Sequence, residues 1–173
     1  MIIELSHVTR KFPTRNATVT ALSDVNFKLE AGTMACLSGP SGSGKSTLLF
    51  TLGGMLRPDS GTVRVLEQDL YGLSKSERAA FRATQIGFVF QEFHLIPYLT
   101  VRENVLLPLG QIKHSARPNF EECEKLLTRL GLAHRMDHKP RQLSAGERQR
   151  TAIARATLLK PPVLLADEPT GNL

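Results

Sequence analysis

The length, composition and charge of the chain already exclude several classes of protein. Its 173 residues, 41% hydrophobic and 22% charged, suit one globular domain rather than a disordered chain or a disulfide-rich scaffold. Two distant cysteines form no C-x-x-C pair, and the net charge of +6 is divided equally between residues 1–90 and 91–173, so composition indicates neither a zinc site nor a nucleic-acid-binding arm.

The first third of the sequence predicts two strands, followed by a strand, a glycine-rich loop and a helix. Residues 2–8 and 19–29 alternate roughly between apolar and polar side chains, as half-buried antiparallel strands do. Residues 34–38 are short and apolar and predict a buried strand. The loop 39–47 then leads into an apolar run of helical length at 48–56.

The next elements are shorter and predict a second group of strands. Residues 61–66 predict a strand, and residues 74–82 predict a helix opened by a Ser-Lys-Ser-Glu capping box. Residues 86–90 and 163–166 are continuous apolar runs, which are typical of buried strands in a parallel sheet.

Between these two buried strands the sequence becomes helical. We expect helices to start near Val101, Phe120 and Gly146, because the first two follow the N-cap residues Thr100 and Asn119 with glutamate three positions later.

The order of elements predicts one α/β domain. Its core takes residues 1–91 and 151–173, with a parallel sheet and an N-terminal antiparallel β subdomain. Residues 92–150 form an inserted α-helical subdomain.

The loop GPSGSGKST fits the G-x-x-x-x-G-K-[ST] pattern between a strand and a helix. The motif predicts a phosphate-loop NTPase whose nucleotide-binding core is formed by residues 1–91 and 151–173. Its glycines let backbone N–H groups converge on phosphates, to which the helix N-terminus adds its positive end. Lys45 is expected to reach the terminal phosphates, and Ser46 to bind Mg²⁺. The residues expected to contact ATP are Gly39, Pro40, Ser41, Gly42, Ser43, Gly44, Lys45, Ser46 and Thr47.

The segment VLLADE places two carboxylates at the end of an apolar strand. Ligands of open α/β sheets lie outside the carboxyl ends of the strands. Asp167 is therefore expected to hold Mg²⁺ through its water shell, and Glu168 to polarise the attacking water as general base. The alternative is a pair of solvated acids.

The segment LSAGERQR predicts a capped helix start, since Glu147 follows Ser144 by three residues. A capped N-terminus with Ser144, Ala145 and Gly146 facing outward is also an anion site. Because the loop 39–47 already serves one phosphate, this second site, formed by Ser144, Ala145, Gly146 and Glu147, is expected to meet the ATP of another molecule.

Taken in order, GPSGSGKST, FVFQ, LSAGERQR and LLADEPTGNL resemble the ATPase subunit of ABC transporters along the whole chain. The stretches FVFQEFHLIPYLTVRENVLLPL and ADEPTGNL are similar to the branch that serves lipoprotein release and macrolide export. The resemblance implies hydrolysis of MgATP in a head-to-tail dimer that drives a transmembrane permease. It also implies a cytoplasmic position, peripheral on the inner face of the membrane, without nucleic acid as partner.

Further residue roles follow from the resemblance alone. Gln91 matches the family's glutamine, which senses Mg²⁺ and the attacking water; the alternative is a polar residue that merely ends a strand. Phe12 falls near the family's adenine-stacking aromatic, or is a core side chain. Ala145 replaces the family's usual glycine, which requires a negative φ at this position.

The family pattern continues beyond TGNL with an aspartate, a helix, a final strand and a histidine that contacts the γ-phosphate. None of the five histidines here, which are His7, His94, His114, His134 and His138, follows Glu168. The sequence therefore predicts an incomplete sheet with uncovered apolar surface, weak ATP binding or aggregation, and poor hydrolysis.

Other interpretations remain open at this stage. A soluble ABC-type ATPase acting on nucleic acid or ribosomes is one alternative, and a truncated ATP-binding relic is another. His134 and His138 have the spacing of helical metal ligands, although surface histidines fit better. Cys36 is expected to be buried and inert.

Overall fold

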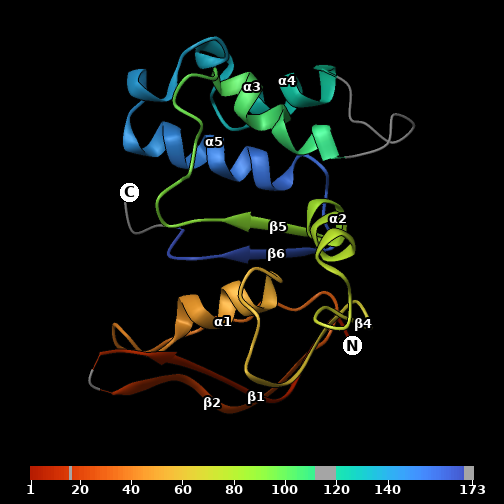
Figure 1. Ribbon diagram of the computed structural model, residues 1–173. Helices are drawn as coiled ribbons and strands as arrows, with labels where there is room; N and C mark the ends of the chain where they lie inside the picture. Colours follow the sequence, from red (N-terminus) through yellow and green to blue (C-terminus); the bar gives the residue numbers. More distant parts are fainter. Residues whose placement is uncertain (16, 112–119, 170–173) are drawn as a thin grey trace. The chain divides into compact units, whose positions relative to one another are not determined.

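The computed structural model describes residues 1–15, 17–111 and 120–169 (Figure 1). The chain divides into two compact units, Met1–Ala79 and Ala80–Leu173. Each unit has its own sheet and its own buried side chains. Among the described residues, no helix has the length and apolar character needed to cross a membrane.

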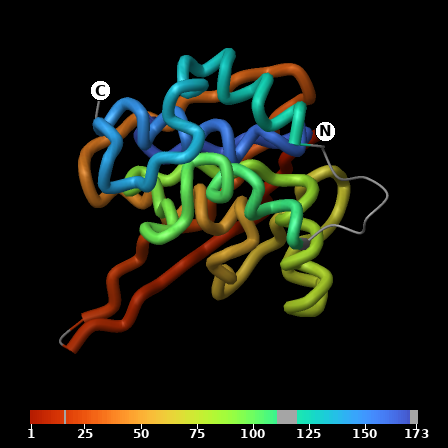
Figure 2. Tube along the Cα trace, turned by 90° about the horizontal axis from the view of Figure 1, so that it is seen from above, coloured from red at the N-terminus to blue at the C-terminus, as the bar shows by residue number. Residues whose placement is uncertain are grey.

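The sheet of the first unit is antiparallel, as expected for this part of the chain. Its strands lie in the order β2-β1-β3-β4, and Figure 2 shows the long strands β1 and β2 running side by side. The strands are β1 (Ile3–Pro13), β2 (Thr18–Leu29), β3 (Ser60–Val65) and β4 (Gln68–Asp69).

The alternation of side chains explains the core of the first unit. Leu5 of β1 pairs with Val63 of β3, and both are almost completely buried. Helix α1 (Lys45–Leu52) contacts β2 and β3 and buries Leu49 and Leu52. A two-residue period therefore turns one face of the sheet toward the helix.

The expected strand at residues 34–38 is absent from the described structure, and this prediction was wrong. No strand of the first unit pairs with these residues, so their apolar side chains have no sheet to join. Met34 is 98% exposed. Cys36 is also exposed, which corrects the expectation that it is buried.

Helix α2 (Lys75–Gln85) begins where the sequence predicted a capping box. The Ser74 backbone N–H donates to Glu77 Oε2 over 2.9 Å, and the Glu77 N–H donates to Ser74 Oγ over 3.2 Å. The helix extends three residues beyond the predicted end at Arg82.

The second unit contains the parallel strand pair that the sequence predicted. Strands β5 (Ile86–Val89) and β6 (Val163–Ala166) are hydrogen-bonded in parallel under helix α5 (Ala145–Thr157), as Figure 1 shows. Gly87 permits this packing, because a Cβ there would lie 2.3 Å from the carbonyl oxygen of Ala156. Leu164 is 51% exposed, so β6 is buried at alternate positions rather than throughout.

The helices of the second unit start where the sequence predicted them. Thr100 caps α3 (Val101–Leu106) through a full capping box with Glu103. Asn119, the expected cap of α4 (Phe120–Arg129), lies outside the described residues. Short 3₁₀ helices complete the unit at η1 (Leu107–Gln111), η3 (Ala133–Arg135) and η4 (Pro140–Gln142).

These helices share a core of buried apolar side chains. Val105 of α3, Leu127 of α4 and Ala154 of α5 are each fully buried in one cluster, together with Cys123. The second compact unit begins at Ala80, before the predicted helical subdomain. The boundaries of that subdomain at residues 92–150 stay a prediction.

Asn104 is a buried polar residue that fixes the segment leading into α3. It is 0% exposed, accepts the Ile96 N–H over 2.7 Å, and donates to the carbonyls of Leu99 and Thr100. Asn104→Ala is expected to lower the free energy of unfolding by about 2–4 kcal/mol, because several buried groups lose their partner. Urea unfolding measures the change, with the exposed Thr128→Ala as control. Equal effects of the two substitutions would contradict this role.

Candidate functional site

The loop 39–47 contains three glycines with positive φ. Gly39, Gly42 and Gly44 have φ values of 156°, 80° and 92°, of which the last two lie in the left-handed region that favours glycine. The Lys45 ammonium donates to the carbonyl oxygens of Gly39 and Pro40, each over 2.9 Å. The lysine side chain therefore folds back over the loop that precedes it.

Gly44 also has no room for a side chain. It is the N-cap of α1, and a Cβ there would lie 2.3 Å from the carbonyl oxygen of Ala21 on β2. Gly42, by contrast, has open space around the same position. The close approach to β2 fixes the N-terminus of α1, and helix N-termini of this kind attract anions.

Phe12 lies on β1, where it pairs with Val19 of β2. Its side chain is half-buried, so it is not part of the buried core of the first unit. The Arg10 guanidinium lies 4.8 Å from the ring centroid of Phe12. A planar cation thus lies over the face of the Phe12 ring. Stacking of a base would use a ring face of the same kind.

The second unit brings two of the predicted catalytic residues into contact. Gln91 follows β5 and Glu168 follows β6, and Gln91 Nε2 donates to Glu168 Oε2 over 2.8 Å. The strands hold the pair together, because the Asp167 N–H donates to the carbonyl of Val89 over 2.9 Å. Parallel strands thus deliver the amide and the carboxylate to one edge of the sheet.

Asp167 and Glu168 differ in exposure although they are adjacent. Asp167 is 6% exposed, whereas Glu168 is exposed and has a φ of 45°, in the left-handed region. Such a conformation is costly for a residue with a Cβ and is held by its surroundings. It turns Glu168 toward Gln91 and leaves a buried carboxylate beside it, where a charge needs a cation or a hydrogen-bond donor.

The predicted capping box at the start of α5 is present. Ser144 Oγ accepts the Glu147 N–H over 3.2 Å, and Glu147 Oε2 accepts the Ser144 N–H over 2.8 Å. Ala145 is the first residue of the helix and has no positive φ, as its side chain requires. The helix N-terminus is therefore compatible with alanine at this position.

Glu147 is held by a residue that the sequence did not indicate. Arg135 Nε donates to Glu147 Oε1 over 2.8 Å, and the glutamate is only 8% exposed. The Ser144 N–H and then Arg135 lower the pKa of Glu147 from the usual 4.5 to about 2. The buried, ionised carboxylate of Glu147 thus stabilises the capping box at the start of α5.

This depressed pKa predicts a pH-dependent stability. The ionised Glu147 contributes its full stability above pH 4.5, and the contribution is lost as the pH falls toward about 2. Glu147→Gln should therefore be less stable than the parent at pH 6, with a gap that narrows below pH 4.5. Urea unfolding of both proteins at several pH values measures the gap. A gap that stays constant down to the acid limit would contradict the assigned cause.

The remaining predicted candidates do not form a site of their own. Within residues 1–15, 17–111 and 120–169, no group of three or more His, Cys, Asp and Glu side chains is arranged to hold a metal. His134 Nε2 lies 3.9 Å from Glu147 Oε1, and His138 Nε2 lies 3.3 Å from Arg135, so both belong to the surroundings of the α5 cap. His114 lies outside the described residues.

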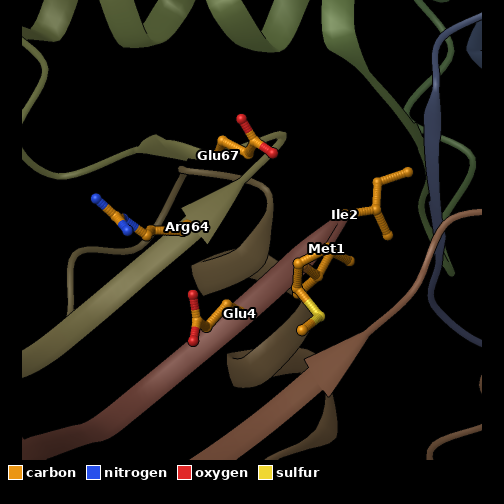
Figure 3. Close-up of a pocket in the computed structure, with 6 residues that line it drawn as sticks. Met1, Ile2, Glu4, Arg64 and Glu67 are labelled. Carbon is orange, nitrogen blue, oxygen red and sulfur yellow. The ribbon is translucent and has the colours of Figure 1, made fainter.

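A small hollow lies at the beginning of β1 (Figure 3). Its volume is about 50 Å³, and Glu4 of β1, Arg64 of β3 and Glu67 line it together with the first residues of the chain. A ligand pocket usually has several hundred cubic ångströms. The hollow therefore does not compete with the loop 39–47 as a nucleotide site.

Comparison with known proteins identifies the family of the chain. The ABC transporter family model matches residues 22–171. The lipoprotein-releasing system ATP-binding protein LolD 1 of Rhodopirellula baltica is 46% identical over 99% of this chain and 75% of its own length. The putative hemin import ATP-binding protein HrtA of Staphylococcus haemolyticus is 42% identical over 100% of this chain and 78% of its own.

A solved structure has the same fold over nearly the whole chain. It is a dimeric post-hydrolysis state of the ATP-binding cassette MJ0796 bound to ADP and Pi, with a TM-score of 0.93 and 39% identity. The match covers 99% of this chain and 76% of that one. The expected family and fold class are confirmed, and the chain belongs to the ABC transporter family as one of its ATP-binding, ATP-hydrolysing cassettes.

Proposed function

We propose that the chain binds MgATP on the loop 39–47 and hydrolyses it with Gln91 and Glu168. The hydrogen bond between these two side chains, 2.8 Å long at the carboxyl ends of β5 and β6, is the observation that carries the proposal. A carboxylate so placed accepts a proton from an attacking water, and the amide orients that water. Glu168 is the general base in this scheme.

The loop and its helix provide the binding energy. Lys45, which now donates to two loop carbonyls, would turn its ammonium toward the terminal phosphates instead. Backbone N–H groups of residues 39–47 and the N-terminus of α1 would meet the phosphate oxygens. Phe12 would stack on the adenine, as its half-buried ring beside Arg10 permits.

The residues assigned to Mg²⁺ fit its chemistry. Magnesium prefers oxygen ligands and commonly takes one or two carboxylates together with substrate phosphates. Ser46 would supply a hydroxyl, Gln91 its amide oxygen, and Asp167 a carboxylate that is 6% exposed. The bound ion would neutralise charge on the transferred phosphate.

We infer that a second copy of the chain completes the site. Ser144, Ala145 and Gly146 form the capped N-terminus of α5, which suits the γ-phosphate of a partner's ATP. Glu147 holds this turn from inside through Ser144 and Arg135. The dimeric state of the similar cassette supports a dimer of this chain, for which the proposed shared site requires a head-to-tail arrangement.

We infer that ATP hydrolysis by the chain drives a transmembrane permease. The chain would then be cytoplasmic and peripheral on the inner face of the membrane. The similarity to a lipoprotein-releasing subunit favours lipoproteins as cargo, and the hemin-import relative marks export or import of another amphipathic molecule as the second candidate.

Two measurements test the proposed function. MgATP hydrolysis by the protein should rise with the square of its concentration below the dimer dissociation constant, because two copies form each site. A rate strictly proportional to concentration would contradict the shared site. Depletion of the protein from its own cells should retain lipoproteins in the inner membrane, and normal release after depletion would exclude lipoproteins as cargo.

A further inference from the structure

Arg155 joins helix α5 to the segment that follows Gln91. Its Nη1 donates to the carbonyl oxygen of His94 and its Nη2 to that of Phe93, each over 2.6 Å. The planar guanidinium suits this arrangement, since its N–H groups form a rigid fork that meets two acceptors at once. One side chain thus holds two successive peptide units.

These carbonyls belong to the turn that contains Gln91. The Phe93 N–H donates to the carbonyl of Phe90 over 3.3 Å, which closes the turn around Gln91. Phe93 and His94 have φ values of 47° and 44°, in the left-handed region that residues with a Cβ rarely adopt. Such a turn persists only where neighbours hold it.

Two further contacts hold the same turn. The His94 ring meets the Phe90 ring edge to face, with 4.8 Å between their centroids. The Arg148 guanidinium lies 5.7 Å from the ring centroid of Phe93. Arg148 and Arg155 are seven residues apart, so they lie two turns apart on one face of α5. That face therefore contacts both the backbone and the side chain of Phe93.

The same helix carries the capped anion site at its start. Ser144 caps α5, and the hydrogen bonds of Arg155 lie eleven residues further along the helix. A helix of 13 residues moves as a stiff rod, so a shift of its N-terminus reaches the turn through Arg155. This turn also sets the position of Gln91 beside Glu168.

We propose that Arg155 is a positioning residue whose two hydrogen bonds couple the partner-facing end of α5 to the Gln91–Glu168 pair. The inference rests on the proposed function, because it names what links the shared ATP site to the hydrolytic pair. In this role Arg155 acts on Gln91 through the carbonyls of Phe93 and His94. It keeps Gln91 in the orientation from which the amide meets the carboxylate.

The first test separates ATP binding from turnover. Arg155→Met keeps the apolar stem and removes both hydrogen bonds, and Arg129→Met removes an exposed arginine of α4 as the matched control. Misplacing Gln91 by about an ångström should lower kcat by about 10²-fold in Arg155→Met. The Kd for MgATP should stay within about twofold of the parent value, because the loop 39–47 is unchanged.

The second test observes the turn directly. The chain contains no tryptophan, so Phe93→Trp places a single indole beside Arg148. In a Glu168→Gln background, in which hydrolysis of bound MgATP should be strongly slowed, dimer formation should change the indole fluorescence when Arg155 is present. With Arg155→Met the dimer should still form by gel filtration, but the fluorescence change should be lost.

A third test measures amide hydrogen exchange in the absence of nucleotide. Its result does not depend on the proposed function, because it reports only whether Arg155 holds the turn. Exchange in residues 91–95 should rise in Arg155→Met and stay at the parent rate in Arg129→Met. A parent protein that forms no MgATP-dependent dimer would count against the proposed function, while unchanged exchange in Arg155→Met would overturn the role of Arg155 alone. Parental kcat in Arg155→Met would overturn it as well.

A variant with a conservative change covers the case in which Arg155→Met fails to fold. Arg155→Lys keeps the charge but replaces the fork with a single ammonium on a shorter reach. It should fold and show a kcat between the parental value and the roughly 10²-fold lower value expected without the two hydrogen bonds. Parental kcat together with parental exchange in Arg155→Lys would show that the two hydrogen bonds are not required.

Discussion

Replacing Glu168 with glutamine is expected to lower kcat for MgATP hydrolysis by about 10²–10⁴-fold. Glutamine has nearly the shape of glutamate and keeps an oxygen that can accept the hydrogen bond from Gln91 Nε2. It cannot take a proton from water at neutral pH, so the general base is lost while the pair stays in place. Single-turnover phosphate release measures the change.

The binding of MgATP provides the internal comparison for this variant. The Kd should be unchanged, because Glu168 acts on water rather than on the phosphates. Glu92→Gln is the matched control, since Glu92 is an exposed carboxylate directly after Gln91, and its kcat should remain at the parental value. If Glu168→Gln retained more than a tenth of the parental kcat, another group would be the base.

Gly44→Ala is expected to weaken MgATP binding by about 10²-fold or more, while Gly42→Ala weakens it by about tenfold. Both glycines have positive φ, which costs an alanine about 1–2 kcal/mol, and 1.4 kcal/mol corresponds to a factor of ten. At Gly44 the added Cβ would also lie 2.3 Å from the carbonyl oxygen of Ala21. The loop and β2 must then move apart.

Equilibrium titration with a fluorescent ATP analogue measures both affinities. Because Gly42 has open space around its Cβ position, the pair separates backbone strain from the steric clash. Equal losses in the two variants would show that the contact with Ala21 does not position the loop. The Tm of Gly44→Ala should also be lower than that of Gly42→Ala, because only the alanine at position 44 clashes with Ala21.

Local rules of chain geometry made much of this fold predictable from sequence. Capping boxes at Ser74, Thr100 and Ser144 fixed three helix starts, and all three are present. A capping box acts within four residues, so no distant partner is needed to form it. The parallel pair β5 and β6 was likewise predictable from two continuous apolar runs.

Contacts between distant residues were harder to predict. The strand expected at residues 34–38 lacks a pairing strand within its unit, and Cys36 is exposed as a result. Apolar composition indicates only that a segment could be a strand, whereas pairing decides whether it is one. The support of Glu147 by Arg135 also joins two helices and has no signal in either segment alone.

If ATP is hydrolysed between two copies of the chain, two inactive variants with defects on opposite sides of the site should restore activity when they are mixed. Lys45→Ala removes the phosphate-loop ammonium. Ala145→Asp puts a carboxylate at the first position of α5, where it suits the helix dipole but repels a partner's γ-phosphate. Ala145→Asn is the neutral control of similar size, and it should retain activity.

Each variant alone should hydrolyse MgATP at less than about a hundredth of the parental rate. A mixed dimer has one intact site, made by the phosphate loop of the Ala145→Asp copy and the α5 N-terminus of the Lys45→Ala copy. Mixing the two variants should therefore restore a substantial part of the parental rate. A mixture as inactive as its two components would contradict a site shared between copies.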